Sequence, residues 1–210
     1  MLSFTVHDTG ETIEVRDFDL VVAGYTGRDE KSVRAHIDEL AAIGVAPPDS
    51  VPAFYELAPD LATQTPAISV SGPNTSGEVE PVLVRAGGRL FLTVGSDHTD
   101  RDIERDSVLE SKAACPKPLG TSVIPIADLD FDALTAESTV DDRQYQHGPL
   151  TALRATTDVL ALYPGKADRD LILFGGTLPL LGGTFIAGTA WTISLTVPGG
   201  ATLAHAYSLA

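Results

Sequence analysis

Four carboxylates gather around one short stretch of the sequence that also contains a Gly-Gly pair. Glu78 and Glu80 lie two residues apart at the start of an apolar run, and Asp97 and Asp102 follow the glycines. Side chains two apart on a strand share one face, and Asp97 returns to the same end if the chain turns at the glycines. Like charges held together need either open water or a cation. Three carboxylates completed by water suit Mg²⁺, Mn²⁺ or Ca²⁺.

A solvated acidic surface is the alternative interpretation of these carboxylates. The chain has 29 Asp and Glu residues, so a local group of acids is not in itself unusual. Spacing alone therefore leaves two possibilities open, a cation site and a hydrated acidic face.

A second group that could do chemistry is the pair His36 and Glu39. Residues three apart on a helix are neighbours, and a glutamate can orient an imidazole that activates a water molecule. A surface ion pair has the same spacing. The Gly-rich stretch of residues 175–183 lacks the Lys-Ser/Thr of a phosphate-binding loop, so tight turns explain its glycines better.

Composition limits the class of protein. The 210 residues, 43% of them hydrophobic and 20% charged, are enough for one globular domain with a sizeable core. A net charge of −15 argues against nucleic acid and anionic membranes as partners. The single cysteine, Cys115, excludes an internal disulfide and fits a reducing compartment. We find no signal peptide and no apolar run of membrane-spanning length, and we expect a cytoplasmic protein.

Hydrophobic periodicity predicts the elements that carry these residues. Val33, Ile37, Leu40 and Ile43 recur at helical spacing and predict a helix from Asp29 to Ile43. Further helices are expected in residues 100–114 and 148–164, and the acidic stretch 128–142 is expected to be a surface loop. Alternating or continuous apolar runs predict strands at 2–6, 12–15, 19–24, 78–85, 89–96, 121–129, 170–174, 189–197 and 201–209. The pattern is that of a β-rich α+β domain.

Several of these stretches resemble motifs of the fumarylacetoacetate hydrolase superfamily, and they occur in the same order. "GEVEPVLV" is similar to its E-x-E strand, and "GSDHTDRDIE" to its N-D-x-S-A-R-D-x-Q segment. "SKAACPKPLG" resembles K-S-F-D-x-x-x-P-L-G-P, and "LILFGGTLPLLGG" resembles I-L-T-G-T-P-x-G-x-G. Upstream, "GYTGRDEKSVRAHIDEL" is similar to the lid segment with its H-x-x-E-L. The likeness runs from about residue 20 to the C-terminus and is closest to the DUF2848 group.

The resemblance implies a fold and a division of the chain. The expected fold is a mixed β-roll or β-sandwich with a few peripheral helices and a lid helix. Residues 1–210 would form one catalytic domain, composed of an N-terminal hairpin (1–19), a lid helix and loop (24–60) and a β-roll core (66–210). Family members usually form homodimers, and a homodimer is expected here.

The resemblance also implies roles for individual residues. Metal ligands would be Glu78, Glu80 and Asp97, with Mg²⁺ expected and Mn²⁺ or Ca²⁺ as alternatives. Catalytic residues would be His36, Glu39 and Lys112. Substrate contacts would come from Tyr25, Arg101, Glu104 and Thr177.

The implied activity is metal-dependent cleavage of a C–C bond in an acylpyruvate or a related 2-oxo or 1,3-dicarbonyl acid, through a metal-stabilised enolate. The alternatives are a decarboxylase, hydratase or tautomerase of 2-oxo acids on the same site, and an oxo-acid-binding protein without catalysis. In each case the partner is a small carboxylic acid.

The chain departs from the superfamily pattern near the site. Glu104 stands where the pattern has glutamine, and Ala113 and Ala114 replace Phe-Asp after the lysine. The extra carboxylate would disfavour a dianionic diketo acid. Lys117 lies between two prolines and is expected to be an exposed loop charge, whereas Lys112 is expected to face the site.

Overall fold

The predicted hairpin of residues 78–96 forms the centre of the main sheet. The computed structural model describes residues 1–42, 47–127 and 129–210, except the side chains of residues 36, 39 and 40. Strands β8 (Val79–Ala86) and β9 (Arg89–Ser96) pair antiparallel, with Val79 opposite Ser96. Gly87 and Gly88 have φ of 56° and 78°, a backbone that L side chains rarely adopt, which explains the glycine pair at the turn.

The main sheet has eight strands in the order β2-β1-β12-β9-β8-β15-β3-β4. Strand β15 pairs parallel to β3 and antiparallel to β8. The carboxyl ends of β3 and β15 therefore meet the start of β8 at one end of the strands. The remaining strands of this sheet are β1 (Leu2–Val6), β2 (Thr12–Val15), β3 (Phe18–Gly24), β4 (Ala53–Leu57), β12 (Ser122–Pro125) and β15 (Asp170–Phe174).

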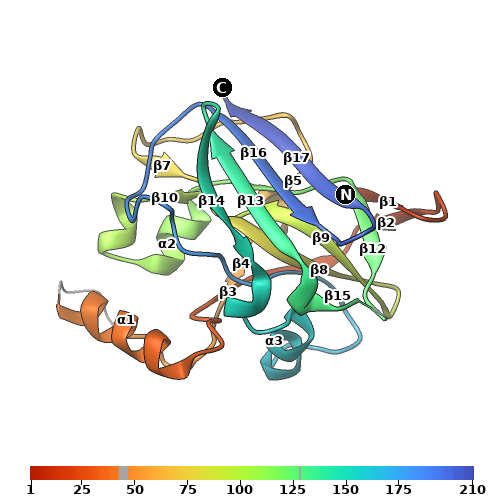
Figure 1. Cartoon of the computed structure of the whole chain (residues 1–210), viewed down its shortest axis with the longest axis horizontal. Helices are drawn as coiled ribbons and strands as arrows, with labels where there is room; N and C mark the ends of the chain where they lie inside the picture. The colour runs from red at the N-terminus through yellow and green to blue at the C-terminus, as the bar shows by residue number, and fades with distance from the viewer. Residues whose placement is uncertain (43–46, 128) are drawn as a thin grey trace.

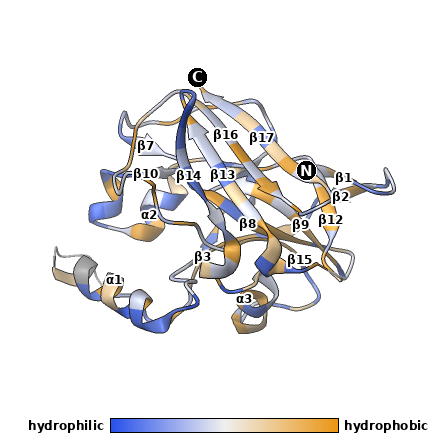
Figure 2. Cartoon of the chain, viewed as in Figure 1, coloured by the Kyte–Doolittle hydropathy of each residue, from blue (hydrophilic) through white to orange (hydrophobic). Residues whose placement is uncertain are grey.

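A five-stranded sheet packs against one face of the main sheet (Figure 1). Its strand order is β14-β13-β16-β17-β6. Buried side chains of β8 and β9, among them Leu92 and Val94, pack against Ile193 and Leu203 of the second sheet. Figure 2 shows strand β14, at the edge, largely in hydrophilic colours. The strands are β6 (Ala67–Ile68), β13 (Thr135–Val140), β14 (Arg143–Pro149), β16 (Ala190–Thr196) and β17 (Thr202–Leu209).

Two short strand pairs and the helices complete the described structure. Strand β10 (Thr99–Asp100) pairs with β7 (Thr75–Ser76), and β11 (Lys117–Pro118) pairs with β5 (Ala62–Thr63). The α-helices are α1 (Glu30–Ala42), α2 (Val108–Ala113) and α3 (Thr156–Leu162), and the 3₁₀ turns are η1 (Pro59–Leu61), η2 (Ile103–Arg105), η3 (Phe131–Ala133) and η4 (Leu150–Ala152). Among the residues that the structure describes, we find no helix that could span a membrane.

The fold confirms the β-rich class and most of the predicted strands, but three local predictions were wrong. The acidic stretch 128–142 contains strand β13, in which Ala136, Ser138 and Val140 face inward at a period of two. The predicted helix 148–164 is a strand end, a 3₁₀ turn and the short helix α3. The predicted helix 100–114 divides into η2 and α2. In the acidic stretch, pairing with β16 outweighs the local preference of the acids for a loop.

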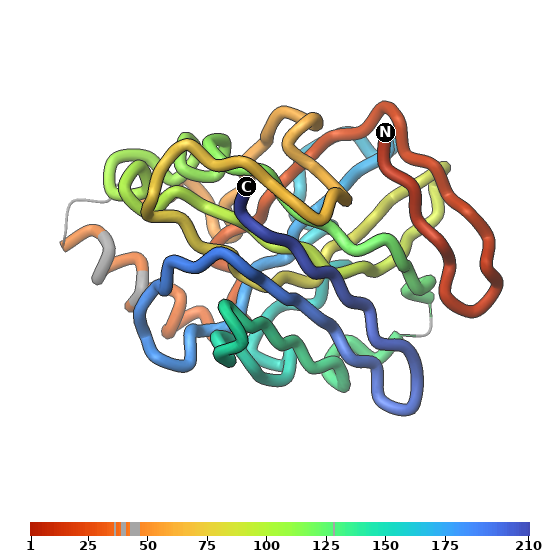
Figure 3. Tube along the Cα trace, turned by 90° about the horizontal axis from the view of Figure 1, so that it is seen from above, coloured from red at the N-terminus to blue at the C-terminus, as the bar shows by residue number. Residues whose placement is uncertain are grey.

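Helix α1 lies at the periphery, at the opposite end of the molecule from the β1–β2 hairpin (Figure 3). Asp29 begins it by accepting hydrogen bonds from the Lys31 N–H at 3.0 Å and the Ser32 hydroxyl at 2.7 Å. An Arg154–Glu30 ion pair at 3.1 Å ties its first turn to the residues after η4. The predicted end of this helix at Ile43 lies outside the described residues.

Candidate active site

The predicted carboxylates meet at one end of the central strands of the eight-stranded sheet. Glu80 lies at the start of β8, and Asp97 follows the end of β9. The Asp97 N–H donates to the Glu78 carbonyl at 3.0 Å, which closes the hairpin at this end. Glu80 and Asp97 are 2% and 0% exposed. The alternative of a solvated acidic face is therefore wrong for these two side chains.

Two lysines neutralise Asp97. Lys112, on α2, forms a short ion pair with it, and the Lys117 ammonium lies 3.3 Å from its other oxygen. Burial alone would raise the pKa of Asp97, but the two ammonium groups outweigh this and lower it to about 2. Burial would likewise lower the pKa of Lys112, but the carboxylates of Asp97, Glu78 and Glu80 raise it. Both groups are therefore charged at neutral pH.

Lys117 is fully buried, so its prediction as an exposed loop charge was wrong. Its ammonium donates to the carbonyls of His98 at 2.6 Å and Cys115 at 3.0 Å, and also to that of Lys112. The flanking prolines favour an extended chain, and strand β11 carries the side chain inward. Burial lowers the pKa of Lys117, while Asp97 partly offsets that effect. The lysine joins the end of α2 to the segment that bears Asp97.

Arg101 lies beside the same carboxylates and is 5% exposed. Its guanidinium contacts Glu78 at 3.1 Å and Glu104 at 2.9 Å. Asp100 accepts from the N–H groups of Asp102 and Ile103, and this begins the turn η2 that brings Glu104 back to Arg101. Burial would lower the pKa of Arg101, but Glu78 and Glu104 raise it.

Glu80 is the carboxylate whose negative charge is least balanced by nearby positive charges. One oxygen accepts from the Gly176 N–H at 2.8 Å, and among the described residues it forms no ion pair. Burial, and then the negative charge of Asp97, raise the pKa of Glu80 well above its usual range, although Lys112 acts in the opposite direction. Gly176 has φ of 97°, and a Cβ there would lie 1.8 Å from the Thr26 hydroxyl oxygen. The loop can therefore present this N–H only with glycine.

A divalent cation fits the charge of this site. Within the described ranges, no three His, Cys, Asp or Glu side chains are grouped so that they could hold a metal ion. Asp97 is paired with Lys112, and Glu78 with Arg101. The donor set is nevertheless three hard oxygen ligands, and Glu80 is buried with an unfavourable charge that a cation would stabilise. The ligand assignment of Glu78, Glu80 and Asp97 stays a prediction.

Two of the predicted substrate residues border the cluster. Tyr25 follows β3 with φ of 57°, an unusual backbone for a tyrosine. Burial raises its pKa, and the charges of Lys112 and Glu104 act on it with opposite signs. The Thr177 hydroxyl donates to the Val79 carbonyl at 2.9 Å and accepts from Gln146 at 2.7 Å. Their contacts with a substrate stay predictions.

The predicted water-activating pair lies on helix α1. The side chains of His36 and Glu39 lie outside the described residues, and only their position on this helix is fixed. Their role stays a prediction.

His98 forms a buried polar network that the sequence did not indicate. Its ring nitrogens lie 3.0 Å from the Tyr207 hydroxyl and 3.0 Å from the Thr75 hydroxyl. Burial, and then the charges of Lys117 and Arg101, lower the pKa of His98 to about 3. A neutral imidazole is therefore part of the packing behind Asp97.

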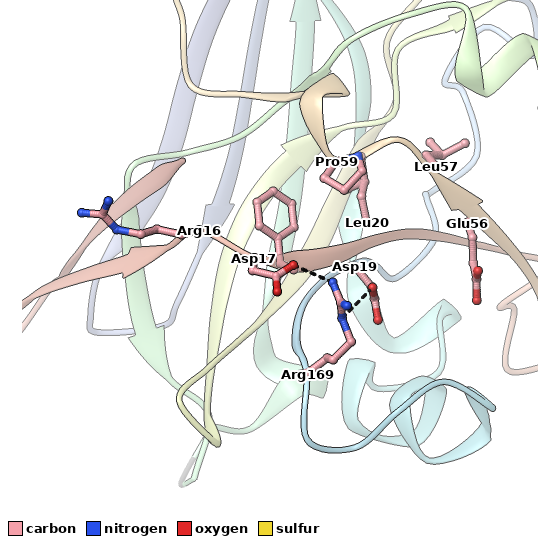
Figure 4. Close-up of a pocket in the computed structure, with 9 residues that line it drawn as sticks. Arg16, Asp17, Asp19, Leu20, Glu56, Leu57, Pro59 and Arg169 are labelled. Carbon is pink, nitrogen blue, oxygen red and sulfur yellow. Dashed lines mark hydrogen bonds and ion pairs between the residues drawn. The ribbon is translucent and has the colours of Figure 1, made fainter.

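Two cavities lie away from this cluster. One of about 190 Å³ lies at the opposite end of strands β3 and β15, where Arg169 contacts Asp17 at 2.7 Å and Asp19 at 3.0 Å (Figure 4). The other, of about 330 Å³, lies on the second sheet beside Trp191. The ion pairs of the first are solvent-exposed, which makes them weak, and we place the candidate active site at the buried carboxylates instead.

Comparison with known proteins gives matches that cover most of the chain. A family model described as a protein of unknown function, DUF2848, matches residues 23–207. Comparison with curated protein sequences gave no match.

Solved structures of similar fold include enzymes of more than one activity. A fumarylacetoacetate isomerase/hydrolase candidate from Oleispira antarctica matches with a TM-score of 0.68 and 15% identity, covering 100% of both chains. The fumarylpyruvate hydrolase from Pseudomonas aeruginosa, solved with Mn²⁺ and pyruvate, matches with a TM-score of 0.64 and 18% identity over 99% of this chain and 95% of its own. The 5-carboxymethyl-2-hydroxymuconate delta-isomerase from Mycobacterium smegmatis matches with a TM-score of 0.63 and 17% identity over 96% and 84%.

Proposed function

The chain belongs to the DUF2848 family and has the fold of the fumarylacetoacetate hydrolase superfamily, and on this basis we propose that it is a metal-dependent C–C hydrolase. Its substrate would be an acylpyruvate or a related 2-oxo or 1,3-dicarbonyl acid. The observation that carries the proposal is the buried pair Glu80 and Asp97 beside the charged Lys112. Buried like charges with strongly shifted pKa values are typical of catalytic or metal sites.

Glu78, Glu80 and Asp97 would hold the cation, with Mg²⁺ expected and Mn²⁺ or Ca²⁺ as alternatives. The Mn²⁺ in the Pseudomonas aeruginosa hydrolase supports a divalent ion. When bound, such an ion acts as a Lewis acid that polarises a carbonyl oxygen.

Lys112 would stabilise the oxo-acid end of the substrate. Its raised pKa keeps the ammonium charged, and Asp97 fixes the direction in which it points. A fixed positive charge in a buried site favours the oxygen on which negative charge develops. Lys117 holds the backbone at the end of α2 and would keep Lys112 in this position.

His36, oriented by Glu39, would take a proton from water as the water oxygen attacks the distal carbonyl. The bond between the former distal carbonyl carbon and the neighbouring methylene carbon then breaks, and its electron pair remains on the pyruvate fragment as an enolate. That fragment gains a proton and leaves as pyruvate, while the distal part leaves as a carboxylic acid. One water molecule is consumed, and no oxidant or reductant is required.

A substrate panel tests the proposal. Acylpyruvates, oxaloacetate and 2-oxo-enoic acids would be assayed with Mg²⁺ or Mn²⁺ and with EDTA. We expect metal-dependent cleavage that falls by about 10²–10⁴-fold in His36→Ala and by at least about 10²-fold in Lys112→Ala. Lys166→Ala, which removes an exposed lysine, is the matched control and should retain activity. Equal activity in EDTA would contradict the metal-dependent reaction.

A decarboxylase, hydratase or tautomerase is the second candidate, since an isomerase shares this fold. These reactions need no water activated by His36. Turnover that survives His36→Ala unchanged, while Lys112→Ala abolishes it, would favour them over the hydrolase. Tight binding of oxo acids without any turnover would instead identify a binding protein.

We also propose a homodimer. Along β16, outward side chains alternate with buried ones. The outward ones, such as Ala190 and Thr192, are small. Such a face allows close approach of a second copy. Light scattering at micromolar concentration tests this, and a monodisperse monomer would refute it.

A further inference from the structure

The guanidinium of Arg101 is enclosed by the protein itself. Its Nε donates to the Ser76 hydroxyl at 2.7 Å, and its two terminal nitrogens contact Glu104 at 2.9 Å and Glu78 at 3.1 Å. A longer bond of 3.4 Å reaches the Ser76 carbonyl. Each of its three nitrogens therefore has a partner, and a substrate carboxylate could form a bidentate ion pair with Arg101 only by displacing one of these partners.

One face of the guanidinium is also covered. The ring of Phe185 lies 3.7 Å from the central carbon of Arg101, as in a cation–π contact. Phe185 as a whole is 46% exposed. A ligand that approaches Arg101 would therefore meet the Phe185 ring and the Glu104 carboxylate, and not an unpaired positive charge.

Glu104 and Lys112 both lie near the phenols of Tyr25 and Tyr55. Burial is the main cause that raises the pKa of both Tyr25 and Tyr55, and the charges of Lys112 and Glu104 act on both phenols with opposite signs. The Lys112 ammonium lies 5.8 Å from the centre of the Tyr55 ring. With 27% of its side chain exposed, Glu104 is the more accessible of the two carboxylates on Arg101, since Glu78 is 14% exposed.

The charge balance limits how much negative charge a ligand can bring. The buried or partly buried carboxylates here are Glu78, Glu80, Asp97, Asp100 and Glu104, and the cations are Arg101, Lys112 and Lys117. With all of them ionised and a divalent cation bound, the positive and negative charges are equal. One carboxylate of a substrate would make the site negative, and a second would be placed in a negative field.

From this geometry we propose that Glu104 determines substrate specificity by occupying Arg101, so that the site selects 2-oxo acids with a single carboxylate and an uncharged tail. The inference rests on the proposed function, because it concerns the ligand of the same site. The single carboxylate binds on the Lys112 side. The tail lies toward Glu104 and the rings of Tyr25, Tyr55 and Phe185, where a second carboxylate would meet a like charge.

Calorimetric titration with two ligands of equal chain length tests the proposal. In the presence of Mn²⁺, wild type should bind 2-oxovalerate, with one carboxylate, at least about tenfold more tightly than 2-oxoglutarate, with two, because a like charge nearby opposes the second. Glu104→Gln keeps the size of the side chain and removes its charge, and the preference should fall by about tenfold. Glu110→Gln, on the exposed side of α2, makes the same change in net charge away from Arg101 and should leave the preference unchanged.

The outcomes separate this inference from the proposed function. Equal affinity of wild type for the two acids, or a preference that persists in Glu104→Gln, would overturn the role of Glu104 while leaving an oxo-acid site in place. Binding of neither acid to wild type would overturn both. The wild-type preference is measured without any substitution, so the inference stays testable if Glu104→Gln does not fold.

Discussion

The two ends of the eight-stranded sheet carry the same types of charged residue in different surroundings. At the carboxyl ends of β3 and β15, Asp97 and Lys117 are both fully buried and form an ion pair at 3.3 Å. At the opposite ends of these strands, Arg169 contacts Asp17 and Asp19, with side chains that are 38%, 90% and 31% exposed (Figure 4). The opposite end also has the cavity, while the first end has the shifted pKa values.

The difference shows that burial, more than the presence of ion pairs, distinguishes the candidate site. Water screens the exposed pairs around Arg169, and such pairs contribute little to stability. Asp97 and Lys117 are not exposed to solvent, so each charge depends on its neighbours and the loss of one is costly. A hollow in the surface is therefore a weaker indication of function here than a group of buried charges.

The largest effect is expected from Lys117→Met. It removes a buried cation that binds three backbone carbonyls and Asp97, and should lower the free energy of unfolding by about 3–5 kcal/mol. Arg169→Met, at the opposite end, should cost less than about 1 kcal/mol. Urea unfolding in EDTA measures both, and similar losses would remove the distinction between the two ends.

Glu80→Gln should abolish stabilisation by metal. At a metal concentration of one hundred times Kd, wild type should gain about 2.7 kcal/mol, whereas the variant should gain almost nothing. In EDTA the variant should be at least as stable as wild type, because glutamine can still accept from the Gly176 N–H without carrying a buried charge. Thermal unfolding with and without Mg²⁺ or Mn²⁺ measures the effect. Equal metal binding in both proteins would contradict the assignment of Glu80 as a ligand.

The stability of the metal-free protein should depend on pH through His98. Its pKa of about 3 in the fold lies below its value of 6.5 in the free side chain, so the unfolded chain binds more protons between these values. This contribution is fully present above pH 6.5 and is lost as the pH falls toward 3, with a loss of about 2 kcal/mol at pH 5. Glu80 acts with the opposite sign, since its raised pKa stabilises the fold at low pH and that contribution is lost as the pH rises.

The difference between wild type and His98→Gln isolates the histidine. Unfolding in EDTA at pH 7.5 and pH 5.0 should show a smaller acid-induced loss in this variant, and His147→Gln, at an exposed position, should behave like wild type. The same dependence in His98→Gln and wild type would show that the imidazole is not the group responsible.

The smallest effect is expected from Asp19→Asn at the opposite end. Removing this partner of Arg169 should change the free energy of unfolding by less than about 1 kcal/mol. Turnover of oxo acids should be unchanged. Loss of activity with retained stability would place function at the cavity of Figure 4 and reverse the comparison.

By itself, the sequence determined the parts of this protein that depend on neighbouring residues. Gly87 and Gly88 determined the turn, the period of two placed Glu78 and Glu80 on one face, and together they brought Asp97 back beside them. The order of several weak motifs indicated the family. Each of these inferences needs only backbone geometry over a short range of chain.

The tertiary structure decided which charges are buried and which side chains are their partners. Lys117 has the sequence of an exposed loop residue, yet its position under His98 and Cys115 makes it the most buried cation of the site. Strand β13 has an acidic sequence that favours a loop, and it forms because β16 pairs with it from more than fifty residues away. Such contacts join different segments of the chain. The desolvation of a charge depends on every segment that packs around it, so the composition near that residue could not predict its burial.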